Sequence, residues 1–181
     1  MINNSVDFEN AFVEIFGNVD KTTLSAIKNN RIRIELGKES ESIPDRIEQA
    51  LYRSRQVFNY CFKNQIWFRI ILWDNNEIEF FKKSNINEYD GYFKEESIIN
   101  ETKVSVLYFY YETFPELNIN SINTLNINHE LGESPSLNIT CLFMDFQNAV
   151  LINVYDDRGL DIYCPNSSLL NGISDKFIQW F

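Results

Sequence analysis

The sequence contains little of what metal or histidine chemistry needs. Its 181 residues include a single histidine, His129, and three cysteines, Cys61, Cys141 and Cys164. The cysteines are odd in number, far apart and beside apolar residues, so we expect reduced thiols in a cytoplasmic protein. Zinc sites need several such ligands at close spacing. We therefore predict no metal and no cofactor.

Basic residues and long apolar runs are also scarce. Lys and Arg number 16 against 26 Asp and Glu, a net charge of −10. This charge disfavours nucleic acid and anionic membranes as partners. No apolar run approaches the roughly 18 residues of a membrane span, and the first residues lack signal-peptide character. We expect a cytoplasmic protein that binds neither nucleic acid nor membranes.

Apolar and aromatic residues are plentiful, at 44% and 15% of the chain, which excludes a disordered protein. The length fits one domain, and no Pro/Gly-rich linker or internal repeat divides it. We predict that residues 1–181 form a single domain.

Hydrophobic periodicity locates most of the elements. The clearest helix covers about 43–62, where Ser42 can cap the first turn and Pro44 fits inside it. The nearly apolar run 66–73 is typical of a central strand covered on both faces. We further predict helices over 6–16 and after Ser167, strands over 31–36, 104–111, 137–146, 149–155 and 160–164, and a short helix plus loop over 117–133.

Residues 78–102 give no clear pattern beyond a short helix over 78–83. Because two short loops join strands near the C-terminus, pairing should be antiparallel. The predicted fold is α+β: a mainly antiparallel five- or six-stranded sheet with helices packed on one face.

Three sequence blocks suggest a family. They are Arg33-Ile34-Glu35-Leu36-Gly37, Arg46-Ile47-Glu48-Gln49-Ala50-Leu51 continuing to Phe58, and Tyr155-Asp156-Asp157-Arg158-Gly159-Leu160-Asp161-Ile162. Together they resemble a family of small bacterial proteins described only as a domain of unknown function, with the last block as its hallmark. The resemblance implies a cytosolic bacterial origin and a fold, but no activity.

The last block has two readings. Asp156, Asp157 and Asp161 could bind a divalent cation or act as acid and base, with Arg158 holding an anion. Alternatively, the segment is a hairpin turn in which Asp caps backbone amides, Arg158 pairs with Asp156 or Asp161, and Gly159 supplies a positive φ. We favour the turn, because the spacing does not match known cation loops.

Two weaker catalytic patterns occur. His129 lies in a polar segment without a nucleophile or orienting partner nearby. Asp90, Glu101 and Lys103 loosely resemble the acids and lysine of a metal-dependent nuclease, but such triplets arise easily by chance.

Arginines and tyrosines raise two further alternatives. Arg31 and Arg33 could gather with Arg69 around Glu35, either as an anion site or as an internal network. Tyr108 and Tyr110 share one face of a strand in an aromatic-rich region, which fits either a binding surface or a core.

Charge is distributed unevenly along the chain. Residues 1–103 hold 14 basic and 17 acidic side chains, and residues 104–181 hold 2 and 9, so the net charges are −3 and −7. One-signed charge steers a complementary partner, although it also serves solubility.

The first functional hypothesis is a non-catalytic acidic module, an immunity protein that masks the basic or active surface of a bacterial toxin. The expected contacts are acidic and tyrosine side chains: Tyr108, Tyr110, Glu112, Glu116, Glu130, Glu133, Asp156 and Asp157. The second hypothesis is an enzyme or ion-binding domain built on residues 156–161. The third is a structural or sensing domain that dimerises through its aromatic face.

Overall fold

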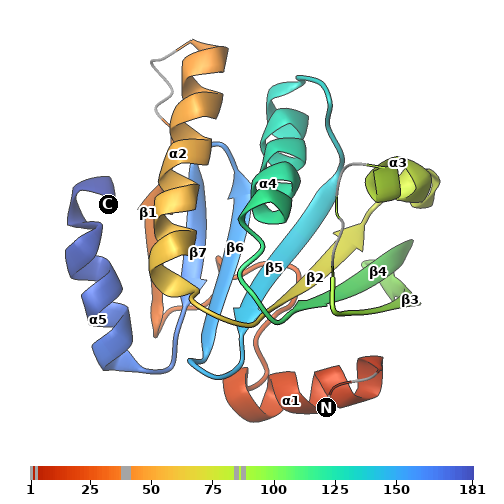
Figure 1. The fold of residues 1–181 in the computed structure, drawn as a ribbon, viewed down its shortest axis with the longest axis horizontal. Helices are drawn as coiled ribbons and strands as arrows, with labels where there is room; N and C mark the ends of the chain where they lie inside the picture. The colour runs from red at the N-terminus through yellow and green to blue at the C-terminus, as the bar shows by residue number, and fades with distance from the viewer. Residues whose placement is uncertain (1, 3, 38–41, 84–85, 87–88) are drawn as a thin grey trace.

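A computed structural model describes residues 2, 4–37, 42–83, 86 and 89–181 (Figure 1). Along the chain the elements are α1 (Ser5–Phe16), β1 (Arg31–Glu35), α2 (Ile43–Cys61), β2 (Ile66–Leu72), a 3-10 turn η1 (Asn75–Glu77), α3 (Ile78–Lys83), β3 (Gly91–Ile99), β4 (Thr102–Tyr111), α4 (Glu116–Leu131), β5 (Ile139–Asp145), β6 (Val150–Asp156), β7 (Gly159–Tyr163), α5 (Ser167–Lys176) and a 3-10 turn η2 (Ile178–Trp180).

The strands form one sheet in the order β1-β7-β6-β5-β2-β4-β3. Each strand pair in it is antiparallel, which confirms the α+β class. The sheet has seven strands, so the prediction of five or six was wrong. The extra strand is β3, which lies in the segment whose pattern was unclear.

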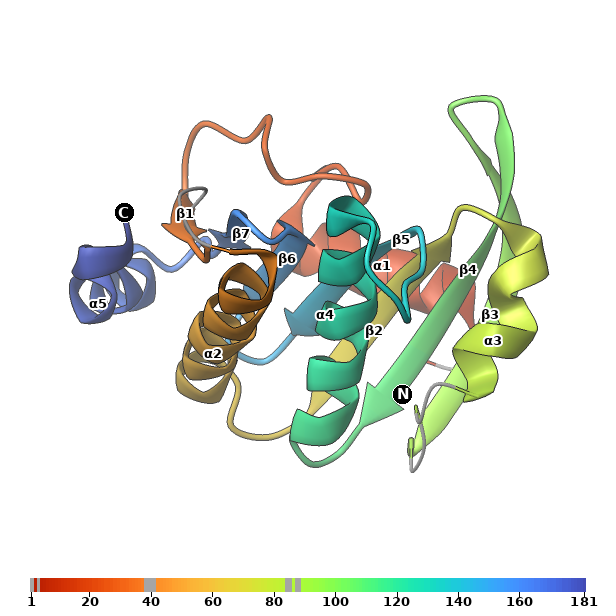
Figure 2. The same ribbon diagram turned by 90° about the horizontal axis from the view of Figure 1, so that it is seen from above.

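Helices cover both faces of the sheet, which corrects the prediction that they pack on one face (Figure 2). On one face, Phe8, Phe12 and Phe16 of α1 pack against Trp67 of β2 and Tyr108 of β4. On the other face lie α2 and α4, with α3 and α5 toward the two sides. Burial on both faces explains why every residue of β2 is buried.

The start of α2 follows its predicted signals. The Ser42 hydroxyl caps the helix by accepting from the Asp45 N–H at 3.4 Å, and Pro44 lies in the first turn. The apolar stripe of the helix, which includes Ala50, Val57 and Phe58, is buried against the sheet. The helix of residues 6–16 is also confirmed; Asn4 caps it, because its side-chain oxygen accepts from the Asp7 N–H at 2.9 Å.

The predicted short helix plus loop over 117–133 is a continuous helix, α4, of 16 residues. Sequence periodicity missed it because its buried face includes asparagines. The Asn126 side-chain amide donates to the Val154 carbonyl at 2.8 Å, and that of Asn128 donates to the Pro135 carbonyl at 2.9 Å. These hydrogen bonds allow polar side chains to occupy core positions.

Within the described residues, no helix is both long and apolar enough to cross a bilayer.

Candidate functional site

The C-terminal block forms the β6–β7 hairpin, and Asp156 closes its turn. Asp156 Oδ1 accepts from the backbone N–H of Arg158 at 2.8 Å and of Gly159 at 3.2 Å. Its other oxygen accepts from Arg158 Nε at 2.7 Å. The turn interpretation and the Asp156–Arg158 pair are therefore correct. Gly159 does not have a positive φ, so that part of the prediction was wrong.

Gly159 is needed for space. A Cβ atom there would lie 2.2 Å from the Tyr155 hydroxyl oxygen and 3.2 Å from the Ile34 carbonyl oxygen. The strands β6, β7 and β1 thus approach each other more closely at this position than a side chain permits.

The hairpin turn is fastened to the end of β1 and to α2. The Asp157 carbonyl accepts from Gly37 N–H at 2.8 Å, and the Arg158 carbonyl accepts from Leu36 N–H at 2.9 Å. The buried Asp157 carboxylate accepts from Arg46 Nε of α2 at 2.9 Å. The three sequence blocks therefore meet at one junction, each from a different element.

Asp161 is held in a similar way. Its buried carboxylate accepts from Arg31 Nη1 at 2.7 Å. Burial raises the pKa of Asp161, and the nearby Arg31 partly offsets that rise. Arg33 lies over the Tyr155 ring at 5.4 Å, and burial raises the pKa of Tyr155 to about 12.

The second hypothesis gains no support from this geometry. Each of the three hairpin aspartates is engaged by a different arginine, so its charge is balanced inside the protein. No group of three or more His, Cys, Asp or Glu residues in the described chain is arranged to hold a metal ion.

The two tyrosines predicted as contacts differ in burial, although both pack on the core cluster beneath α1. Tyr108 is fully buried, its hydroxyl donates to Glu95 Oε1 at 2.6 Å, and its ring stacks on Phe93. Tyr110 is half-buried, and its hydroxyl donates to Gln65 Oε1 at 2.9 Å. The core alternative therefore describes Tyr108, and a partner cannot reach that side chain in this fold.

The predicted cluster of Arg31, Arg33 and Arg69 around Glu35 does not form. Three strands separate β1 from β2 in the sheet, so the arginines lie apart. Arg69 is buried, donates from Nη1 to the Lys21 carbonyl at 3.0 Å, and lies over the Tyr108 ring.

The nuclease-like triplet is also not assembled. Asp90 precedes β3 and accepts from the Glu112 N–H at 2.7 Å, whereas Lys103 pairs with Glu96 near the other end of the β3–β4 hairpin.

The four predicted glutamates are exposed, but they lie at the two ends of α4. Glu112 and Glu116 are near its start, and Glu130 and Glu133 are at its end, about 24 Å away along a helix of 16 residues. Glu116 faces Arg55 of α2 at 3.8 Å. Because Arg55 is in the second half of α2, the two helices run antiparallel, and the end of α4 lies toward the start of α2 (Figure 1).

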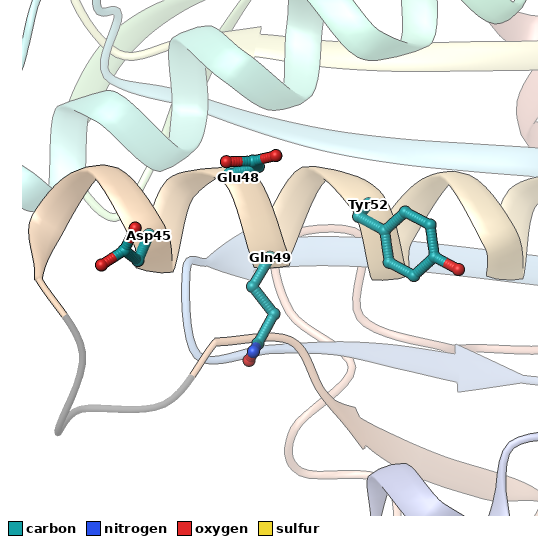
Figure 3. A pocket seen from close by; sticks show the side chains of 4 residues that line it. All are labelled: Asp45, Glu48, Gln49 and Tyr52. Atoms are coloured by element: carbon teal, nitrogen blue, oxygen red, sulfur yellow. The ribbon is translucent and has the colours of Figure 1, made fainter.

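The start of α2 adds acidic residues that the sequence reasoning missed. Asp45 and Glu48, together with Gln49 and Tyr52, line a surface hollow of about 420 Å³ (Figure 3). Tyr52 is 55% exposed. The spacing of Asp45, Glu48 and Tyr52 by three and four residues was the available signal, since it places them on one helix face. We call Asp45, Glu48, Glu130 and Glu133 the acidic helix end.

A second hollow, of about 630 Å³, lies between the η1–α3 segment and residues 134–137. Glu77 lines it, and burial, followed by the nearby Asp74 carboxylate, raises the Glu77 pKa. His129 is exposed in the last turn of α4, close enough to Glu77 to oppose that rise. The hollow also contains Phe80, which is 44% exposed.

Comparison with known families gives one result. A family model described as a domain of unknown function (DUF3885) matches residues 8–181. The chain belongs to this family. The DUF3885 match spans the whole sheet and all but the first three residues of α1, so it includes helices on both faces of the sheet. Neither the search of curated proteins nor that of solved structures found a match.

Proposed function

We propose that this DUF3885 protein is a non-catalytic binding module, a bacterial cytoplasmic immunity protein that neutralises a toxin with a basic surface. The acidic helix end is the proposed contact surface. Carboxylates can dominate the interface of an acidic inhibitor with a basic enzyme, and they speed its association.

The observation that carries this proposal is the placement of Glu130 and Glu133. Both are exposed at the C-terminal end of α4, where the helix dipole is already negative. Carboxylates at this position work against helix stability, so their presence is better explained by binding than by folding. Neither they nor Glu48 forms an ion pair with another described residue.

Tyr52 complements these charges. Tyr52 is 55% exposed and lies beside Glu48, and tyrosine is enriched where interfaces combine packing with a polar edge. We leave Asp156, Asp157 and Tyr108 out of the proposed surface because their side chains are buried.

The test is toxin neutralisation in cells. The probe is the protein encoded beside this chain in its genome, expressed in a bacterial host under inducible control. We expect the wild-type chain to restore growth and the triple variant E48Q, E130Q and E133Q to fail. The matched control is E14Q, E101Q and D175N, which removes three exposed charges elsewhere and should protect as well as wild type.

Titration of the purified pair should show at least about tenfold weaker binding for the triple variant than for the control. Failure of the wild-type chain to protect, or equal losses in both variants, would contradict the proposal.

A further inference from the structure

The β3 strand is a long open edge of the sheet. It has nine residues and pairs with β4 in an unbroken register, and β4 is its sole strand partner in the described chain. The opposite edge strand, β1, has five residues and packs against α5. The hairpin formed by β3 and β4 projects beyond the rest of the sheet (Figure 2). Edges of this kind present unpaired N–H and C=O groups that can add another strand.

One face of this edge is exposed. Along β3, Tyr92, Lys94, Glu96 and Ile98 alternate outward, and Tyr92 and Ile98 are 39% and 76% exposed. Between these two apolar residues lie one positive and one negative side chain. Charged residues often protect an edge strand from pairing. Here, however, their order along β3 favours pairing with a second copy of the same strand.

The order of side chains is self-complementary. In antiparallel pairing of β3 with β3 of a second copy, a two-fold axis perpendicular to the sheet keeps each side chain on its own face. Centred on Glu95, this pairing sets Lys94 against Glu96 twice and Tyr92 against Ile98 twice. Centring on Lys94, Glu95 or Glu96 sets one like-charge pair at the axis in each case. Only the Glu95 centre also forms the two Lys94–Glu96 pairs, because the other two centres place Lys94 and Glu96 against uncharged or identical residues.

We infer that this protein forms a homodimer by antiparallel pairing of two β3 strands centred on Glu95, giving a continuous sheet across both copies. The inference stands apart from the proposed toxin contact, because the acidic helix end is formed by α2 and α4.

Glu95 limits the strength of this dimer. At the centre of the pairing, Glu95 faces Glu95 of the second copy on the α1 side of the sheet, where each carboxylate accepts from its own Tyr108. Two strands also make a small interface compared with that of a permanent dimer. We expect reversible association, with a dissociation constant at or above about 1 µM.

Charge reversal tests the register. K94E places Glu against Glu in the dimer, and E96K places Lys against Lys. Each should raise the dimer dissociation constant about tenfold or more, measured by sedimentation over a range of concentrations. A mixture of K94E and E96K restores opposite charges at both sites, so native mass spectrometry should show heterodimers in preference to either homodimer.

The heterodimer also controls for local effects, since E96K disturbs the Glu96–Lys103 pair within one chain. E95Q removes the central repulsion but keeps an acceptor for Tyr108, so it should tighten the dimer. The toxin-contact variant E48Q/E130Q/E133Q should dimerise as wild type does. A wild-type chain that stays monomeric at its highest soluble concentration would overturn the inference, as would a dimer that neither charge reversal weakens.

Discussion

At the scale of single residues, the junction around Gly159 shows how closely three strands are fitted together. Tyr155 covers Gly159, and its buried hydroxyl has no hydrogen-bond partner among the residues that the structure describes. An unpaired buried hydroxyl is costly, so the ring gains its stability from packing and from Arg33, which lies over its face at 5.4 Å.

We predict that G159A destabilises the protein by about 1–3 kcal/mol, because the new methyl group overlaps the Tyr155 hydroxyl. Y155F removes that hydroxyl and should itself be nearly neutral. The double variant G159A/Y155F should therefore be more stable than G159A alone. Urea denaturation of the three variants measures the difference, and an additive loss in the double variant would show that the contact with the hydroxyl is not responsible.

At the scale of elements, α4 is a helix whose buried face is partly polar. Buried amides act here as connectors between helix and sheet, since Asn126 of α4 bonds a carbonyl of β6. Asn153 of β6 in turn donates to the Cys141 carbonyl of β5 at 3.0 Å. Such bonds fix the position of a helix more precisely than apolar contacts alone.

N126A should cost about 1–3 kcal/mol, because it leaves the buried Val154 carbonyl without its donor. N120A is the matched control on the same helix: Asn120 is half-buried, and alanine favours the helix there. Thermal or urea unfolding should thus separate the two substitutions clearly. Similar stability changes for both would mean that the Asn126 bond contributes little.

At the scale of the whole molecule, folding redistributes the charge. The C-terminal part carries most of the net negative charge, but Arg31 and Arg46 of the N-terminal part pair with its buried Asp161 and Asp157. The charges that remain exposed include glutamates at both ends of α4. The helix dipole stabilises a carboxylate at the N-terminal end and destabilises one at the C-terminal end.

This difference predicts opposite effects on stability. E130Q combined with E133Q should raise the melting temperature at low salt, since carboxylates near a helix C-terminus are unfavourable. The free energy of unfolding should rise by about 0.3–1 kcal/mol for each charge removed. E116Q should lower it, because Glu116 is in the first turn and faces Arg55. Added salt should reduce both effects. A fall in melting temperature for E130Q/E133Q would remove the dipole argument for the binding surface.

Local patterns in the sequence determined a large part of the fold. The Ser42 cap, Pro44 and an apolar stripe predict α2 because a helix start and a helix face need only nearby residues. The apolar run of β2 and the turn chemistry of Asp156 are equally local. They predicted a central strand and a closed hairpin without any knowledge of their neighbours.

Tertiary structure alone decided the features that depend on distant partners. The Lys-Glu-Glu run inside β3 is a poor strand sequence, and it becomes a strand because β4 supplies its hydrogen bonds. In the sequence, the asparagines of α4 suggest a face exposed to solvent. Asn126 can be buried because β6 supplies an acceptor for its side-chain amide. Likewise, the charge along the chain does not show which of the carboxylates are neutralised by arginines. Nor does it show that the packing of α2 against α4 brings acidic residues from distant segments together. Such pairings join residues far apart in sequence, and only the packed chain brings them within reach of each other.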